Sequence, residues 1–578
     1  MKLNKGDSFK IISNVTDLRY EFAVTELKKY LCLAGLEYAS DGVCFTVDYD
    51  NTLKSEGMSI AVENDTITIL GEGNGILYGV YEFLERFIGF NFGAYTEVVP
   101  QKDEYLIENT KYVKNGADLC YRTAVAQYSV WAGDPDRALT PAFIDWLAKN
   151  RYNRVLTWVS VYEGLKEKGL MPEFEKRGIK LSVGHHQSIF TFLPPEKYLK
   201  TNPEYYRLEK DGSRFDPSDY NGQLVLCCRN DECIAEVAKN AISWLKENPN
   251  VDCLAFWPND GKADQCCCEK CAPYSKIENY LYFENELAKR IRKELPDIKI
   301  DVLIYIDLWD CPENMQLCDG VVIDEAVWSA NGLRNCGAPD GSGIIGTDYA
   351  KNILKYRKNC KNTVFYDYYM GNYNARQRLM PATDEMQSIF KFCVQNGISG
   401  SGTQFECFNV WNNLLNFFAF ARTQYDTELD FETVLARFST LFGNGGKYVI
   451  EIMKMAERVC DGQDSIRNMG IYTMQNLDMT KVYALFDKAL ESETNPVCRN
   501  NLRMLRLAFR YSDLLTSDKT EDTAREPHPL TCIDPTGELA YMSYTFDGYH
   551  NKNSLYGIAM PLTNKNDKKP DSVWYDFE

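Results

Sequence analysis

The chain has 578 residues, too many for a single hydrophobic core, so its length predicts about two to four domains. Apolar residues make up 45% and charged residues 25% of the sequence, as in ordinary globular proteins. The net charge of −18 would repel a polyanion, which argues against nucleic acid as a partner.

The N-terminal segment carries no apolar stretch of the length that a secretory signal needs. No run of about 20 apolar residues occurs either, so no membrane partner is expected. These features predict a cytoplasmic protein whose 20 cysteines are reduced, and they leave its oligomeric state open. With only four histidines, a histidine-rich metal centre is excluded.

Residues 1–113 alternate short strands with helices. Helical spacing runs over Thr16–Leu33, and a second amphipathic segment spans Ile76–Phe87. Between them, Met58–Glu63 and Thr66–Leu70 flank Asn64-Asp65, which predicts a hairpin. This part is therefore expected to be a small α+β domain with a sheet covered by helices.

Residues 114–425 alternate apolar strands with helical patterns, of which Pro141–Lys149 and Asp231–Lys246 are examples. Eight such alternations predict a (β/α)₈ TIM barrel. A doubly wound open sheet is the alternative, but it predicts a glycine-rich phosphate turn that the sequence lacks. The eight candidate strands are Tyr121–Gln127, Arg154–Val159, Lys180–Gly184, Cys253–Trp257, Lys299–Ile306, Gly320–Asp324, Thr363–Tyr368 and Gly397–Gln404.

Residues 426–578 are expected to form a helical region with an irregular polar tail after Ser517. The amphipathic segments there are Phe431–Leu441, Tyr448–Val459, Met479–Glu491 and Val497–Leu515.

Catalytic groups of such a barrel lie at the C-terminal ends of its strands and in the loops that follow. The side chains at these positions are mainly carboxylates, tyrosines, tryptophans and histidines. Sugar rings stack on aromatic side chains, and sugar hydroxyls pair with carboxylates and amides, so the set suits a carbohydrate. The candidates are His185, His186, Trp257, Asn259, Asp260, Glu325, Trp328, Tyr366, Tyr368, Glu406 and Trp411.

Each candidate also has a purely structural interpretation. Asn259-Asp260-Gly261 is a common turn tripeptide, although its place after an apolar strand favours a functional role. The two histidines could end a strand with their hydrogen bonds satisfied. Glu325 and Glu406 could be salt-bridge partners, and single tyrosines are more often packing residues.

A cysteine cluster follows Asp260 closely. Cys266, Cys268 and Cys271 form a C-x-C-x-x-C pattern, and Cys227 or Cys228 could supply a fourth thiolate. Such a set fits a structural zinc ion, whereas free loop thiols or an exported disulfide are the alternatives. No catalytic cofactor is expected.

Two groups of motifs resemble known families. Residues 75–85 (GILYGVYEFLE), followed by Val98-Val99-Pro100, resemble the small N-terminal domain of β-hexosaminidases and α-glucuronidases. Gly184-His-His, Gln223–Cys227, Pro258-Asn-Asp-Gly and the cysteine pattern resemble a bacterial barrel family related to hexosaminidases, which includes endo-β-N-acetylglucosaminidases. The resemblance covers roughly residues 10–460, in pieces.

The resemblance implies a retaining, substrate-assisted reaction in which the 2-acetamido oxygen of the substrate attacks C1 and forms an oxazoline. Asn259 would then polarise the acetamide and Asp260 would be the general acid. Since the family has an acidic pair here, Glu325 or Glu406 remains open as the acid, with Asp260 as polariser. The same comparison implies that His185 or His186 contacts the substrate or the general acid. It also implies that Tyr368 hydrogen-bonds the acetamide and that Glu406 binds sugar hydroxyls.

Two other functions stay open. An inverting α-glucuronidase-like enzyme would need a cationic clamp, for which Arg122 and Arg376 are candidates, and carboxylates about 6.5–9.5 Å apart. A carbohydrate-binding protein with a decayed barrel is the second, because Asn259 stands where an acid is expected.

Overall fold

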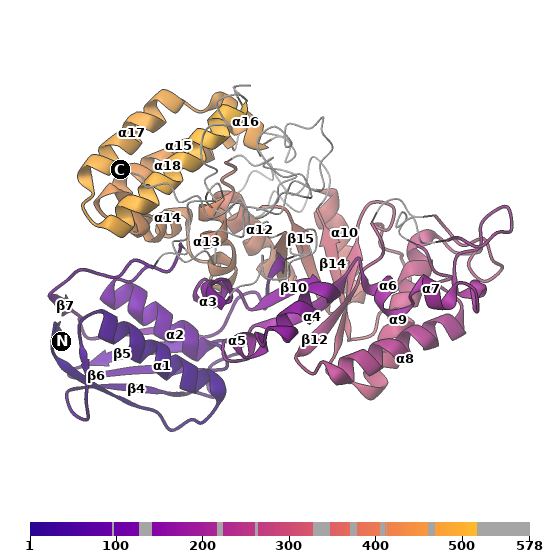
Figure 1. Ribbon diagram of the computed structural model, residues 1–578, viewed down its shortest axis with the longest axis horizontal. Helices are drawn as coiled ribbons and strands as arrows, with labels where there is room; N and C mark the ends of the chain where they lie inside the picture. Colours follow the sequence, from indigo (N-terminus) through magenta and orange to yellow (C-terminus); the bar gives the residue numbers. More distant parts are fainter. Residues whose placement is uncertain are drawn as a thin grey trace.

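The structure, a computed structural model, has three parts that follow one another along the chain (Figure 1). A small α+β domain precedes a closed barrel, and a group of helices follows it, as the sequence predicts. The residues described are 1–94, 97–126, 141–216, 224–260, 264–327, 347–369, 379–404, 411, 413–460 and 469–516.

The N-terminal part is a six-stranded mixed sheet of order β3-β2-β4-β6-β5-β8, on which helices α1 and α2 pack. The expected hairpin is confirmed: β5 and β6 pair antiparallel with Glu63 opposite Thr66, and Asn64 takes a positive φ of 53° in the turn. A separate pair joins β1 to β7. The elements are β1 Lys2–Asn4, β2 Ser8–Ile12, α1 Leu18–Leu33, β3 Glu37–Tyr38, β4 Val43–Tyr49, β5 Met58–Glu63, β6 Thr66–Gly71, α2 Gly75–Phe83, η1 Leu84–Ile88, β7 Glu104–Leu106 and β8 Thr110–Lys114.

The central part is a closed barrel of eight parallel strands, which confirms all eight predicted strands. The strands are β9 Tyr121–Ala126, β10 Arg154–Trp158, β11 Lys180–His185, β12 Val251–Phe256, β13 Lys299–Ile304, β14 Val321–Ala326, β15 Asn362–Asp367 and β16 Gly400–Gln404.

Helices connect most of the strands around the outside of the barrel. One connection differs: residues 305–320 between β13 and β14, all of them described, form turns and no helix. The helices are α3 Pro141–Lys149, α4 Val159–Glu167, α5 Met171–Glu175, α6 Ser188–Phe192, α7 Pro195–Tyr198, η4 Pro203–Tyr205, α8 Asp231–Glu247, α9 Lys276–Glu294, α10 Asp348–Asn359, α12 Thr383–Asn396 and α13 Leu414–Tyr425.

Side chains at alternate positions of each strand fill the barrel interior in layers, as strand geometry requires. Near the N-terminal ends Tyr121, Val322 and Val364 pack together. Near the C-terminal ends a second cluster contains Trp257 and Tyr366, among other residues. The barrel is therefore a packed core whose upper layer is aromatic.

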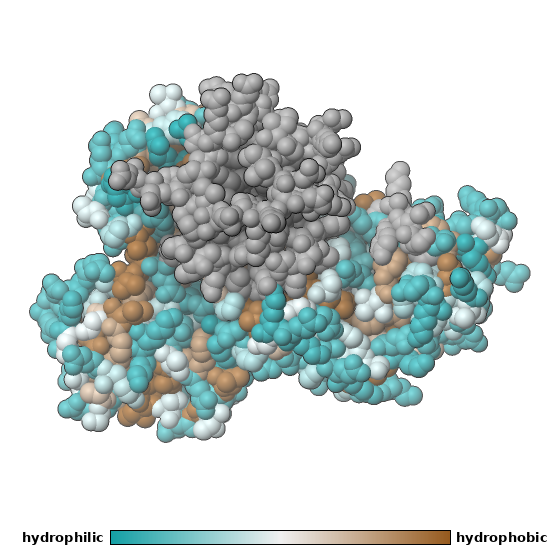
Figure 2. Space-filling view, in the orientation of Figure 1, coloured by the Kyte–Doolittle hydropathy of each residue, from teal (hydrophilic) through white to brown (hydrophobic). Residues whose placement is uncertain are grey.

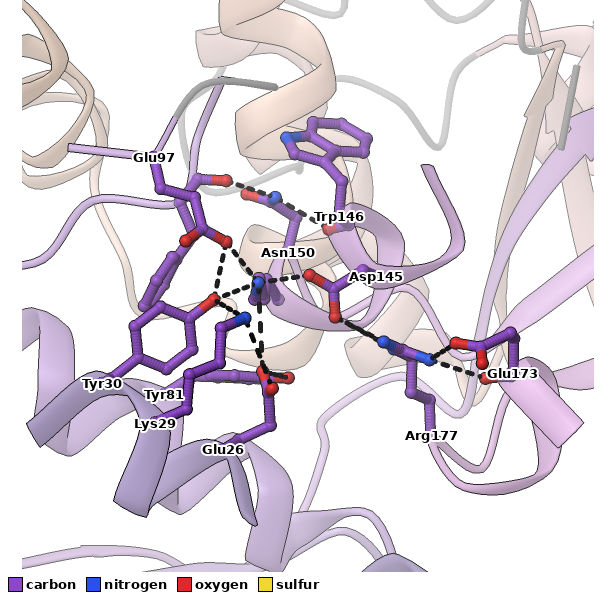
Figure 3. Close-up of polar contacts among 12 residues, drawn as sticks. Glu26, Lys29, Tyr30, Tyr81, Glu97, Asp145, Trp146, Asn150, Glu173 and Arg177 are labelled. Atoms are coloured by element: carbon purple, nitrogen blue, oxygen red, sulfur yellow. Dashed lines mark hydrogen bonds and ion pairs between the residues drawn. The ribbon is translucent and has the colours of Figure 1, made fainter. Parts of the chain in front are cut away.

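The N-terminal domain docks on the barrel through buried charges. The two terminal guanidinium nitrogens of Arg122 donate to Glu56, at 2.9 and 3.0 Å. Figure 3 shows a second group of polar contacts, in which Glu26 and Tyr30 of α1 lie close to Asp145 of α3. Lys149 is buried at its centre and bonds Tyr30 at 2.5 Å. Buried charges of this kind fix one relative orientation of the two parts.

The four helices predicted after the barrel are confirmed, and one more, α16, lies among them. They are α14 Phe431–Ser439, η8 Thr440–Gly445, α15 Gly446–Cys460, α16 Met469–Asn476, α17 Met479–Ser492 and α18 Pro496–Thr516. On the side seen in Figure 2, hydrophilic side chains cover most of the described surface. Within the described residues, no helix is both long and apolar enough to cross a membrane.

Candidate functional site

The end of β12 carries the residues on which the sequence prediction rests. Trp257 is buried in the upper layer of the barrel, and its Nε1 donates to Oδ1 of Asp301 at 2.7 Å. Asn259 is 2% exposed, yet neither its amide nitrogen nor its amide oxygen has a hydrogen-bond partner among the described residues. Asp260 is exposed, and the hydroxyl of Tyr305 donates to its Oδ1.

His185 ends β11 in a left-handed backbone conformation, with φ of 60°, which is unusual for a residue other than glycine. Its ring lies between Trp158 and Trp257, at centroid distances of 5.3 and 4.3 Å. Neither ring nitrogen has a partner in the described part of the chain. Burial holds the pKa of His185 well below its usual value, so the ring is neutral and offers one donor and one acceptor.

His186 has its orientation fixed by a hydrogen bond between Nδ1 and the carbonyl oxygen of Pro258. Because that carbonyl can only accept, Nδ1 carries the proton and Nε2 is the acceptor of the neutral ring. Burial away from solvent lowers the pKa of His186, although the negative charge of Asp260 opposes this shift. His186 therefore faces Asp260 as a neutral imidazole.

Aromatic rings continue from β12 to β15. The rings of Trp257 and Tyr366 are 5.6 Å apart, and those of Tyr366 and Tyr368 are 5.0 Å apart. Five predicted residues, His185, His186, Trp257, Tyr366 and Tyr368, are thus brought together at the C-terminal end of the barrel. Tyr305 and Trp158, which complete the group, were not predicted.

Two carboxyl groups lie in the barrel interior. Asp301 and Asp324 lie on the inward face of β13 and β14, at 4% and 3% exposure. Burial raises the pKa of Asp301 to about 6. Burial, together with the charges of Asp301 and Glu325, raises the pKa of Asp324 well above its usual value. Asp301 accepts from Trp257 and so anchors its ring.

Glu325 lies on the opposite face of β14 from Asp324. Its Oε1 accepts from Asn352 of α10 at 2.8 Å, so the side chain points towards the outer helices. Burial raises its pKa to about 8. The structure does not bring Glu325 together with Asp260.

Three other predicted residues lie elsewhere. Trp328 and Glu406 fall outside the described residues. Trp411 is buried in the main core, and its Nε1 has no partner among the described residues. Asn413, two positions on, is also buried and has both amide atoms unpaired within the same part of the chain.

Buried polar atoms without partners are rare in folded proteins, and each needs an explanation. Within the part of the chain that the structure describes, such atoms occur in several places, and four of the residues that carry them lie near or after the C-terminal ends of barrel strands: His185, Asn259, Asp324 and Asn413. Water or the polar groups of a ligand could satisfy them. Together with the aromatic rings, this set marks a candidate binding site at the C-terminal ends of β11, β12, β14 and β16.

The four predicted metal ligands also come together. One ligand atom from each of Cys227, Cys266, Cys268 and Cys271 lies within 4.8 Å of the others. Cys228, the alternative to Cys227, is not part of this group.

The sequence profile of a family described as Domain of unknown function (DUF4838) matches residues 92–454, well over half of the chain. The chain belongs to the DUF4838 family. Its match takes in the whole barrel and the candidate site. A comparison with curated proteins finds no match.

Solved structures of glycoside hydrolases resemble the fold. A GH138 enzyme that targets pectin rhamnogalacturonan II has 11% identity and a TM-score of 0.55, over 90% of this chain and 72% of its own. CpGH84B has 10% identity and a TM-score of 0.51, over 94% and 92%. A β-N-acetylhexosaminidase from Bacteroides fragilis has 12% identity and a TM-score of 0.48, over 76% and 92%. At such identities the likeness to the first two concerns the fold alone.

Proposed function

We propose that this DUF4838 protein is a glycoside hydrolase that acts on a sugar with a 2-acetamido group. The observation that carries the proposal is the pair at the end of β12, in which a buried amide with no partner among the described residues, Asn259, precedes an exposed carboxylate, Asp260. The fold likeness to GH138 and GH84 enzymes supports the class of reaction.

In the proposed reaction, the protonated form of Asp260 gives its proton to the glycosidic oxygen as the bond to C1 breaks. The acetamido oxygen of the substrate attacks C1 and forms an oxazolinium ion, whose ring N–H donates a hydrogen bond to Oδ1 of Asn259. Asp260, now ionised, takes a proton from water as the water oxygen attacks C1 and opens the oxazolinium ring, so the product keeps the configuration at C1.

The neighbouring groups suit these roles. Tyr305 donates to Oδ1 of Asp260 and so orients the carboxylate. His185 is neutral and buried, so it can pair with a sugar hydroxyl without the cost of a buried charge. The buried rings of Trp257 and Tyr366 pack 5.6 Å apart, and Trp257 also contacts His185, so the surroundings of these polar groups are apolar.

The alternative, an inverting glucuronidase, needs a cationic side chain at the site to bind the uronate carboxylate, and Arg122 does not lie there. Arg122 is fully buried and bonded to Glu56 at the N-terminal end of β9, far from the strand ends that carry Asp260. Arg376, the other candidate, lies outside the described residues.

The test is hydrolysis of p-nitrophenyl N-acetyl-β-hexosaminides, compared with the matching glucosides and glucuronides. Asp260→Asn should lower kcat on the N-acetyl substrates about 10²–10⁴-fold. The melting temperature should not change, because the side chain is exposed. Glu269→Gln, an exposed carboxylate on the same loop, is the matched control and should keep full activity.

Full activity of Asp260→Asn, or a preference for glucuronides, would contradict the proposal. If no aryl glycoside is cleaved, a glycan digest followed by mass spectrometry separates an endo-acting enzyme from a protein that only binds sugar. Inhibition by N-acetylglucosamine thiazoline, which mimics the oxazoline, is expected for the substrate-assisted route.

A further inference from the structure

Four cysteine thiols converge in the structure, although they come from two separate segments of the chain. Cys227 precedes α8, whereas Cys266, Cys268 and Cys271 lie between Asp260 and α9. We propose that these four residues bind one structural zinc ion. The assignment of the metal does not depend on the proposed function.

The sulfur positions fit a tetrahedral ion. A zinc ion with sulfur ligands at about 2.3 Å holds its sulfur atoms about 3.8 Å apart. The Sγ atom of Cys227 lies 3.5 Å from that of Cys268 and 3.8 Å from that of Cys271. Two disulfides would instead bring the sulfurs together as two bonded pairs, each about 2.05 Å long. A shared centre therefore explains the geometry better than pairwise bonding.

The surroundings suit thiolate ligands in a closed site. Cys227, Cys266 and Cys271 are buried and Cys268 is half-buried. Four protein sulfur atoms would fill all four coordination positions of the ion, as in structural zinc sites. The backbone N–H of Leu208 donates to Sγ of Cys266 at 3.3 Å, which helps to offset the negative charge of four thiolates.

The cysteine loop is also held from outside the four ligands. The side-chain amide of Asn279 in α9 donates to the carbonyl oxygen of Cys271 at 3.0 Å, and Gln265 donates to the same oxygen at 3.0 Å. Arg229, two residues after Cys227, bonds Asn279 at 2.6 Å. The two segments thus meet at a preformed position, and the ion would join them and fix their spacing.

The consequence for the candidate site rests on the proposed function. Cys266 lies six residues after Asp260 in the sequence, so an ion at the four thiols anchors the loop that presents Asp260. Zinc is then a positioning element and takes no part in the reaction. Its removal should lower kcat and leave the pH profile of the remaining activity unchanged.

The metal content of the purified full-length chain tests the assignment directly. We expect one zinc per chain by inductively coupled plasma mass spectrometry after dialysis against a chelator. Cobalt exchanged into the protein should give the absorption bands of tetrahedral thiolate coordination. Cys271→Ser should lose most of the bound zinc and melt at a lower temperature. Cys267→Ser, an exposed neighbour outside the cluster, is the matched control and should retain it.

Three outcomes would overturn the proposal: wild-type protein that neither contains zinc nor takes up cobalt, a disulfide among the four cysteines, or iron as the bound metal. Each is measured on the wild-type chain, so the test remains decisive even if Cys271→Ser fails to fold. Zinc with no hydrolase activity would support the metal site and refute the proposed function alone.

Discussion

Asp324 and Glu325 are neighbours in sequence but lie on opposite faces of β14, because successive side chains of a strand alternate. Asp324 faces the barrel interior near Asp301, and burial, followed by the charge of Asp301, raises its pKa. Glu325 faces α10 and bonds Asn352. Both carboxyl groups have a raised pKa, so a perturbed pKa by itself does not distinguish a residue near the site from one behind it.

Glu325→Gln should remove a pH-dependent loss of stability. The fold raises the pKa of Glu325 from 4.5 to about 8. The unfolded chain therefore releases its proton first, and folding weakens as pH rises from about 4.5 to 8, by at most about 1.4 kcal/mol per pH unit. The variant should gain stability relative to the wild type as pH rises through this range, measured by urea unfolding at several pH values. Its hydrolase activity should be kept.

Glu313→Gln, an exposed carboxylate of the preceding connection, is the control and should follow the wild type at every pH. A large loss of kcat in Glu325→Gln, at unchanged stability, would instead restore Glu325 as a candidate general acid.

The sequence could place His185, His186, Trp257 and Asp260 at strand ends, because an apolar run shows where a buried strand stops. It could not say which of Asp324 and Glu325 points inward, since that depends on the register of β14 in the closed sheet. A usable signal was present in β13 and the residue that follows it, where Asp301, Leu303 and Tyr305 stand at alternate positions and share one face. Applying the alternation to each strand would have found Asp301 and Tyr305.

At the scale of elements, the eight strands were predictable because each is a short apolar run between helical patterns. The connection 305–320 was not predictable, because the alternation of strands and helices in a (β/α)₈ barrel leads one to expect a helix there. In its place the segment packs against α10, where Asn352 donates to the carbonyl oxygen of Trp309 at 2.9 Å. This segment is thus held by a contact with a distant residue, which no periodic pattern within the segment itself could predict.

Gly184 shows how closely β11 and β12 must approach. Its φ is +143°, and a Cβ atom there would lie 2.2 Å from the carbonyl oxygen of Ala255. Gly184→Ala should therefore cost about 1–3 kcal/mol of stability through overpacking. Because His185 follows at once, substrate affinity should fall as well. Differential scanning calorimetry and KM measurements on one preparation would show both effects.

Gly402→Ala in β16 is the matched control, because its Cβ would meet no atom closer than 3.4 Å. Equal stability losses in the two variants would mean that the close approach of β11 and β12 does not matter.

At the scale of the whole molecule, Glu82 connects all three parts. This buried residue of α2 accepts from Arg86 of its own domain at 2.6 Å, from Arg151 of the barrel at 3.2 Å and from Arg437 of α14 at 3.1 Å. Burial alone would raise the pKa of Glu82, but the three guanidinium groups outweigh it and lower the pKa to about 2. No local pattern reveals such a contact, because its members are up to 355 residues apart.

Glu82→Gln should therefore destabilise the entire molecule rather than one domain. The variant leaves three arginines near a neutral amide, and breaking a buried ion pair costs roughly 3–5 kcal/mol. Since the fold lowers the pKa of Glu82, its contribution is complete above pH 4.5 and is lost as pH falls towards 2. The difference in the free energy of unfolding between variant and wild type should thus be large at pH 7 and shrink in acid.

Glu104→Gln, which breaks the exposed pair with Lys2, is the control and should change the melting temperature little. Separate melting transitions for the barrel and the N-terminal domain in both wild type and Glu82→Gln would show that Glu82 does not couple them.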